Sequence, residues 1–285
     1  MKAALSGYSV ASPTLSSRTN VSGASLAIVI PYYKPDYFED LMEALSRQLD
    51  QNFHLYIVDD CSKSSPIPIL KRFRDIFAQL TYVKFEKRLG HVCLASHWNR
   101  CLQVCKREEW AWLLPDDDIP SANCVSAFRK ALLSGFLNNA NVAVFPSSII
   151  NSCGDVVVPA LFEGPKVAEP GYSFYMRQLL GQSQGSTLGE NIFRLSALRG
   201  VGGFVPFPKA WGSDHATILL TASNSNIAWI SDAHFYFRQS GLNISSNRSD
   251  GHEKMKAKFL YARWLRSMDK FIFNEANLDL FYRLI

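Results

Sequence analysis

What this 285-residue sequence lacks excludes several classes of protein. No run of 18 or more apolar residues occurs, so we expect no membrane-spanning helix. No Gly-x-Gly-x-x-Gly follows the first apolar segment and no Gly-x-x-x-x-Gly-Lys-Ser/Thr occurs, which argues against a dinucleotide-binding protein and a P-loop enzyme. The six cysteines form no Cys-x-x-Cys pair, and none has a histidine at zinc-finger spacing. We therefore expect reduced thiols in a cytoplasmic protein.

The composition is that of a globular protein with a sizeable core, with 47% hydrophobic and 19% charged residues. The net charge of +5 suits anionic small molecules or an acidic membrane surface, but it is too small to indicate nucleic-acid binding. Residues 1–25 are rich in Ser, Thr and Gly and contain no apolar core of signal-peptide length. We expect them to form a disordered tail.

Strands and helices alternate along the first half of the chain. Four apolar runs are typical of buried strands, and segments with helical spacing of apolar residues separate them. This alternation predicts an α/β fold with a mostly parallel central sheet flanked by helices. The four runs are 26–33, 53–58, 81–86 and 110–114.

The second half of the chain has shorter elements. We expect helices near 121–134, 172–180 and 214–222 and strands over 142–150, 189–195 and 227–237. The residues after 250 combine basic and aromatic side chains and predict an amphipathic helical segment over 251–285. This segment could lie on the inner face of the cell membrane, or it could pack its aromatic rings against the domain.

Three adjacent carboxylates, Asp116, Asp117 and Asp118, directly follow the fourth apolar run. Like charges about 4 Å apart repel by roughly 1 kcal/mol even in water, so a folded site keeps them most readily when a cation neutralises them. Mg²⁺ and Mn²⁺ prefer such oxygen ligands and bind through one or two carboxylates plus substrate phosphates. The alternative is a solvated acidic turn that caps the next helix.

Polar residues also lie at the ends of the first and second apolar runs. They are Tyr32 and Tyr33 at the end of the first run, Lys34 directly after it, and Asp59 and Asp60 after the second run. Ligands of open α/β sheets bind beyond the carboxyl ends of the strands, where these residues and the acidic cluster would meet. An aromatic ring can stack on a base, an aspartate can accept hydrogen bonds from a base or a ribose, and a metal can hold a diphosphate. The pattern therefore predicts a nucleotide-diphosphate site, although Asp59-Asp60 alone could equally form a turn.

Taken in order, these segments resemble a family 2 glycosyltransferase with the GT-A fold, over about residues 26–245. The resemblance implies a glycosyltransferase domain at 26–250, with a nucleotide-binding half at 26–120 and an acceptor-binding half at 121–250. The segments that carry the resemblance are IVIPYYKP, YIVDDCS, RLGHVCLASHWNRCL, LLPDDDI, ENIFRLSALRGVGGF followed by WGSDHA, and FRQSGLNIS.

The resemblance assigns roles to individual residues. It implies that Asp214 is the catalytic base and that Asp117 and Asp118 hold the metal, with Pro115 standing where family members often have another aspartate. Ser213 stands where another acidic residue often precedes the base. Acceptor-binding residues would be Glu190, Trp211 and Gly212. Residues for the nucleotide and donor would be Pro31, Tyr32, Tyr33, Lys34, Asp59, Asp60, Gly90, Asn99, Asp116, Asp117 and Arg238.

The family's reaction is inverting transfer of a sugar from a nucleotide-diphosphate sugar, here expected to be a UDP-sugar, with Mn²⁺ or Mg²⁺. The Gln-x-x-Arg-Trp signature of processive synthases is absent, which favours addition of a single sugar. The acceptor would be a hydroxyl of a glycan or a lipid-linked glycan in a bacterial pathway. His234, near Arg238, is a further candidate for reaching the metal.

Two other functions remain open at this level. A sugar-nucleotide nucleotidyltransferase would use a similar site, but it should carry a glycine-rich loop after the first strand, and PYYKPDYFED has no glycine. A non-catalytic protein that binds nucleotide sugars would not need both Asp214 and the acidic cluster.

Overall fold

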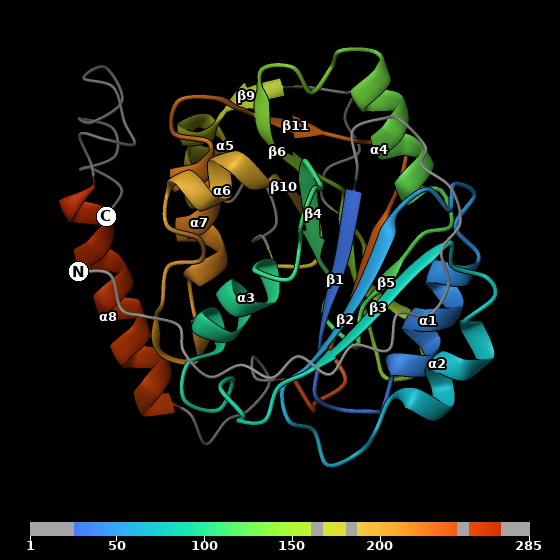
Figure 1. The fold of residues 1–285 in the computed structure, drawn as a ribbon. Helices are drawn as coiled ribbons and strands as arrows, with labels where there is room; N and C mark the ends of the chain where they lie inside the picture. Colours follow the sequence, from blue (N-terminus) through green and yellow to red (C-terminus); the bar gives the residue numbers. More distant parts are fainter. Residues whose placement is uncertain (1–25, 161–167, 181–186, 244–250, 269–285) are drawn as a thin grey trace.

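A computed structural model describes residues 26–160, 168–180, 187–243 and 251–268, and it is built around an eight-stranded sheet (Figure 1). The strand order is β3-β2-β1-β4-β10-β6-β11-β9. The strands are β1 (Leu26–Tyr32), β2 (His54–Asp59), β3 (Gln79–Lys84), β4 (Trp110–Leu113), β6 (Ala140–Val144), β9 (Ala168–Pro170), β10 (Asn191–Arg194) and β11 (Asn226–Trp229). The expected tail at 1–25 lies outside the described residues.

Most strands of this sheet run in one direction. β1 pairs in parallel with β2 and with β4, β2 pairs in parallel with β3, and β6 with β11. β10 runs antiparallel between β4 and β6, and β9 is an antiparallel edge strand. The structure confirms the expected α/β fold with a mostly parallel sheet. The parallel arrangement places the carboxyl ends of β1, β2 and β4 next to one another.

Helices cover both faces of the sheet, as Figure 1 shows. Successive residues of β1 point to opposite faces, so Ile28 packs in one apolar core and Val29 in the other. The first core contains side chains of α1 (Phe38–Ser46), α2 (Ile67–Phe73) and α4 (Cys124–Leu133). The second contains side chains of α3 (Leu94–Leu102), α5 (Gly171–Leu179), α6 (Leu195–Gly200) and α7 (Ser213–Thr221).

A second, four-stranded sheet has the order β5-β12-β7-β8 and corrects two expectations. The single strand expected over 142–150 divides at Pro146 into β6 and β7, and the segment over 227–237 divides into β11 and β12. Proline has no N–H to donate to a continuing ladder, and the chain changes sheet at this residue. The strands are β5 (Ile119–Pro120), β7 (Ser147–Ile150), β8 (Val156–Val158) and β12 (Phe235–Arg238).

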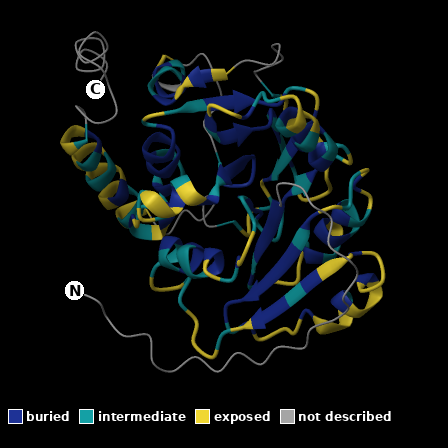
Figure 2. Cartoon of the chain, turned by 45° about the horizontal axis from the view of Figure 1, so that its top comes forward, coloured by how far each residue is buried: buried dark blue, intermediate teal, exposed yellow. Residues whose placement is uncertain are grey.

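The long helix α8 (Gly251–Ser267) lies along one side of the molecule, beside α7 (Figure 1). Tyr261 and Trp264 pack edge-on against Phe207, which precedes the short 3₁₀ helix η1 (Pro208–Ala210). The remainder of the helix is largely exposed (Figure 2). Among the described residues no helix is long and apolar enough to cross a membrane. Residues 269–285 of the expected C-terminal segment lie outside the described part.

Candidate active site

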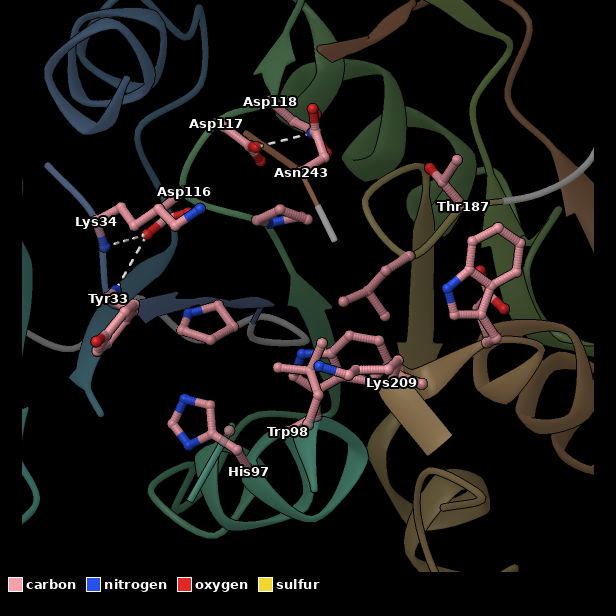
Figure 3. Close-up of a pocket in the computed structure, with 18 of the residues that line it drawn as sticks. Tyr33, Lys34, His97, Trp98, Asp116, Asp117, Asp118, Thr187, Lys209 and Asn243 are labelled. Carbon is pink, nitrogen blue, oxygen red and sulfur yellow. Dashed lines mark hydrogen bonds between the residues drawn. The ribbon is translucent and has the colours of Figure 1, made fainter. Parts of the chain in front are cut away.

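A cavity of about 1100 Å³ opens at the carboxyl ends of the parallel strands (Figure 3). One end is formed by residues that follow β1, β2 and β4, and the opposite wall is formed by η1, the start of α7 and one face of α8. We call these the strand end and the helix end of the cavity. Of the residues expected in the site, those that line the cavity are Pro31, Tyr33, Lys34, Asp60, Gly90, Asp116, Asp117, Asp118, Trp211, Gly212 and Asp214.

Asp116 ties the loop after β1 to the end of β4. Its Oδ2 accepts hydrogen bonds from the backbone N–H groups of Tyr33 and Lys34, each at 3.1 Å (Figure 3). Burial raises the pKa of this carboxyl group, and the two backbone hydrogen bonds oppose that shift. The Nζ of Lys34 donates to the backbone oxygen of Leu242 at 2.7 Å, and both residues line the cavity.

Asp118 is buried and Asp117 is partly buried, yet each accepts few hydrogen bonds. The Oδ2 of Asp117 accepts a bond from Asn243 Nδ2 at 2.9 Å, and the Oδ1 of Asp118 accepts one from the backbone N–H of Arg238 at 2.8 Å. The Oδ2 of Asp118 is buried without a hydrogen-bond partner. Burial and the charge of Asp116 raise the pKa of Asp117 to about 7, and burial and Asp117 raise the pKa of Asp118 well above its usual range.

This donor set fits a hard divalent cation. A cation beside Asp117 and Asp118 would engage the unpartnered oxygen and offset the repulsion among three carboxylates. Within the described ranges no group of three or more His, Cys, Asp or Glu side chains is placed to hold a metal. Mg²⁺ sites that use one or two carboxylates and complete their shell with phosphates and water need no such group.

Of the two aspartates at the end of β2, only Asp60 lines the cavity. It accepts hydrogen bonds from the backbone N–H groups of Leu89 and Gly90, each at 2.7 Å, and pairs with Arg100. A Cβ at position 90 would lie 2.7 Å from Asp60 Oδ2, so the close approach requires glycine. Asp59 is turned into the core, where it accepts bonds from the backbone N–H of Ser62 and from the Tyr82 hydroxyl.

Of the two tyrosines at the end of β1, only Tyr33 lines the cavity. Tyr33 lines the cavity with the Arg88 guanidinium 3.8 Å from its ring centroid. Tyr32 is fully buried, its hydroxyl donates to the backbone oxygen of Ser64, and its ring packs on Phe38. Only Tyr33 is therefore placed to stack on a ligand.

Asn99 and Glu190 do not line the cavity. Asn99 holds the backbone of Phe204, since its Oδ1 accepts from the Phe204 N–H at 2.7 Å and its Nδ2 donates to the Phe204 oxygen at 2.9 Å. Glu190 is buried and accepts bonds from the N–H and the hydroxyl of Thr187, which does line the cavity. Both residues support the cavity walls from behind.

Arg238 is likewise buried, with 2% of its surface exposed, and its guanidinium does not line the cavity. Its Nε donates to the backbone oxygen of Asp117 at 2.9 Å, Nη1 donates to the oxygen of Ser152, and Nη2 pairs with Asp40. Arg238 therefore positions the turn that carries the acidic cluster. His234 bonds to Ser148 through Nε2 at 2.8 Å and is also outside the cavity lining.

The helix end of the cavity is built around Asp214, in the first turn of α7. The helix starts after Gly212, whose φ of +80° favours glycine. The Ser213 hydroxyl accepts a bond from the Phe207 N–H at 3.2 Å and fixes the turn before the helix. A carboxylate in the first turn is favoured by the helix dipole. Trp211 lines the cavity beside it, with Lys254 Nζ 4.9 Å from its ring centroid.

Several further cavity residues had no role assigned from the sequence, although Arg88, His97, Trp98 and Asn243 lie within segments that carry the family resemblance. They reach the cavity from segments far apart in the sequence, and their positions follow from the packing of α3, η1, the loop after β12 and α8. They include Arg88, His97, Trp98, Thr187, Lys209, Asn243, Lys258 and Tyr261.

The structure thus brings a carboxylate cluster at the strand ends and a second carboxylate, Asp214, into one cavity on a mostly parallel α/β sheet. The chain belongs to glycosyl transferase family 2, because the model of that family matches residues 27–197. A search of curated protein sequences finds no match.

Solved structures of glycosyltransferases share the fold. Residues 1–349 of Staphylococcus aureus TarS in complex with UDP-GlcNAc superpose with a TM-score of 0.69 at 18% identity, over 90% of this chain and 69% of that one. The TarS structure without this truncation has a TM-score of 0.56 at 18% identity, and the match covers 76% of this chain and 37% of TarS. GalNAc-T7 with UDP, GalNAc and Mn²⁺ has a TM-score of 0.57 at 11% identity, over 76% and 44% of the two chains.

Proposed function

We propose that this glycosyltransferase moves a single sugar, with inversion at the anomeric carbon, from a UDP-sugar to a hydroxyl group of a glycan or lipid-linked glycan. Mn²⁺ or Mg²⁺ would be the cofactor, held by Asp117 and Asp118. The supporting observation is that one cavity contains both the acidic cluster after β4 and Asp214 at the start of α7. TarS with UDP-GlcNAc and GalNAc-T7 with UDP and Mn²⁺ share the fold and support the choice of nucleotide and metal.

The two carboxylate groups suit two different tasks. An acceptor hydroxyl must lose its proton as it attacks the anomeric carbon, and the Asp214 carboxylate is the candidate general base that takes this proton. The attacking oxygen and the leaving diphosphate must lie on opposite faces of the sugar for inversion. A divalent cation, when bound, neutralises the charge of the diphosphate leaving group.

The strand end would hold the nucleotide. The Tyr33 ring with Arg88 on its face offers a stacking surface, and Asp60 offers a carboxylate fixed by two backbone N–H groups. Pro31, Lys34, Gly90 and Asp116 complete the wall at this end. Trp211 and Gly212 would contact the acceptor, because they directly precede α7 on the Asp214 side.

The first test is thermal unfolding with UDP, GDP, TDP or CDP, each with Mn²⁺ and with EDTA. A ligand at 100 times its dissociation constant stabilises the protein by roughly 2.7 kcal/mol. We expect a Mn²⁺-dependent rise in Tm with UDP. The absence of a shift with all four nucleotides would contradict the proposal.

Asp214→Asn separates catalysis from binding. We expect the variant to transfer sugar about 10²- to 10⁴-fold more slowly, because a positioned general base contributes about that much to the rate. The nucleotide should still raise its Tm as in the unmodified protein. Unchanged transfer by Asp214→Asn would assign the base elsewhere, and NMR of the product anomer tests inversion directly.

A peripheral contact with the inner face of a membrane is a further part of the proposal. Met255 and Phe259 lie one turn apart on the outer side of α8 and are 68% and 67% exposed, with Lys256 and Arg263 also exposed on the helix. Such a basic and apolar surface suits an anionic lipid headgroup layer. Flotation with anionic vesicles tests it, and recovery of all the protein in the lipid-free fraction would remove this part.

A further inference from the structure

Helix α8 contributes to the cavity although it lies beyond the part of the chain that matches the family model. The match ends at residue 197, whereas α8 spans Gly251–Ser267. Lys258 and Tyr261 of this helix line the cavity at the same end as Asp214. The wall opposite the strand end is therefore formed partly by side chains that the family match does not include.

The cavity-lining face of α8 is anchored on both sides of Lys258. One turn before it, the Lys254 ammonium lies 4.9 Å from the centroid of the Trp211 ring. Three residues after it, Tyr261 packs so closely on Gly212 that a Cβ there would lie 3.0 Å from its ring. Residues four and three apart share one face of a helix, so these contacts fix the direction in which Lys258 points. The helix thus presents Lys258 to the cavity from a packed position.

The helix end of the cavity carries more positive than negative charge. Lys258 is exposed to the cavity and has no ion-pair or hydrogen-bond partner among the described residues. Lys209 of η1 lines the cavity as well and extends toward Trp98 (Figure 3), from a backbone with φ of +54°. Asp214 is the carboxylate at this end. Two ammonium groups around one carboxylate create a positive potential that attracts anions.

These charges are placed apart from the acidic cluster. The phosphates of the donor belong at the strand end, where Asp117 and Asp118 would hold the metal and where Lys34 and Arg88 supply further cations. Lys258 instead lies on the face of α8 whose neighbouring residues contact Trp211 and Gly212, just before α7. Neutral sugar hydroxyls need no positive potential, whereas a phosphate group forms charge-assisted hydrogen bonds with ammonium groups.

We propose that the acceptor carries a phosphate group near its attacking hydroxyl and that Lys258, together with Lys209, binds this phosphate. The inference rests on the proposed function, since it assigns the Asp214 side of the cavity to the acceptor. Two sources share this chemistry, a phosphorylated glycan and the diphosphate headgroup of a prenyl-linked glycan. Lys258 is a specificity-determining residue in both cases.

The test measures binding to protein already saturated with Mn²⁺ and the nucleotide that stabilises it. Four probes are titrated by calorimetry: hexose 6-phosphate, the free hexose, a short prenyl diphosphate and the prenyl alcohol. We expect the phosphate member of at least one pair to bind and its neutral partner not to bind, and the pair that responds identifies the source. Lys258→Gln should weaken that binding about 10- to 100-fold, the effect of losing a hydrogen bond to a charged group.

Two variants complete the design. Lys258→Arg keeps the positive charge and should retain most of the affinity, and Arg266→Gln removes an exposed charge from the same helix and should leave the affinity unchanged. Equal binding within both pairs, binding of neither phosphate member, or full binding by Lys258→Gln would overturn the inference. Nucleotide binding is measured first in every variant, so a failure of the proposed function appears as loss of that signal rather than as loss of phosphate binding.

Discussion

Buried carboxylates lie at both ends of strand β4, and they differ in how well hydrogen bonds stabilise their negative charge. Before the strand, Glu108 has only 6% of its side chain exposed and accepts hydrogen bonds from the Tyr56 hydroxyl at 2.8 Å and from the N–H of Lys106 at 2.9 Å. His54 Nδ1 lies 3.0 Å from the same carboxylate. After the strand, Asp118 keeps one oxygen with no partner.

The pKa values follow these surroundings. Burial alone would raise the pKa of Glu108, but the hydrogen bonds from His54, Tyr56 and the backbone outweigh it and lower the pKa to about 2. For Asp117 the burial and the neighbouring charges prevail, and the pKa is raised to about 7. Glu108, before the strand, is therefore a carboxylate whose charge stabilises the fold. The charges of Asp117 and Asp118, after the strand, instead cost folding free energy. Carboxylates held at such a cost are candidates for a functional site.

Asp117→Asn should produce the largest contrast between the two ends. We expect transfer to fall about 10³-fold or more, because the proposed metal ligand would be lost and the charge of the leaving diphosphate would no longer be neutralised. In EDTA the Tm should stay the same or rise, since an amide does not repel Asp116 and can still accept the bond from Asn243. If Asp117→Asn lost several degrees in Tm and kept Mn²⁺-dependent transfer, Asp117 would be a stabilising residue and not a functional one.

Glu108→Gln tests the other end of strand β4, and we expect it to lower stability without changing sugar transfer. A pKa lowered from 4.5 to about 2 corresponds to about 3 kcal/mol of stability at neutral pH. We expect a lower free energy of unfolding in denaturant titrations and unchanged transfer at 25 °C. Glu86→Gln, at an exposed position, is the matched control and should change neither quantity.

The pH dependence gives the sign of this effect. The pKa of Glu108 is lower in the folded protein than in the unfolded chain, so its stabilisation is fully present above about pH 4.5 and is lost as the pH falls toward 2. The difference in unfolding free energy between the unmodified protein and Glu108→Gln should therefore shrink between pH 5 and pH 2. A constant difference over this range would show that the carboxylate charge is not the cause.

The sequence was sufficient to predict which strand ends meet, because the alternation of strands and helices implies parallel strands whose carboxyl ends share one edge. It could not predict which residue of an adjacent pair faces the cavity. Tyr33 and Asp60 line the cavity while Tyr32 and Asp59 point into the core. Neighbouring residues at a strand end point in opposite directions, and the register of the strand decides between them.

The helix end of the cavity was less predictable. Asp214 and Trp211 were identified through a resemblance, but Lys258 comes from a helix whose docking depends on packing between Phe207, Tyr261 and Trp264. Aromatic contacts between segments some 50 residues apart leave no local pattern in a single sequence. Arg238 was expected to bind the nucleotide or donor, and the structure places its guanidinium outside the cavity lining, because its partners are the Asp117 and Ser152 oxygens and Asp40.

The smallest expected effect on ligand binding is that of Asn99→Ala. This variant tests whether Asn99 only supports the protein around the cavity or also contacts the nucleotide. Asn99→Ala removes both hydrogen bonds to the Phe204 backbone and leaves that N–H and oxygen in a partly buried place. We expect a loss of about 1–3 kcal/mol in the free energy of unfolding, the usual cost of leaving such groups unpaired. Because the Asn99 side chain does not line the cavity, the dissociation constant of the nucleotide at 25 °C should stay within about twofold of that of the unmodified protein. Calorimetry on the two proteins at equal folded concentration measures it, and a tenfold weaker nucleotide complex with unchanged stability would place Asn99 in contact with the nucleotide after all.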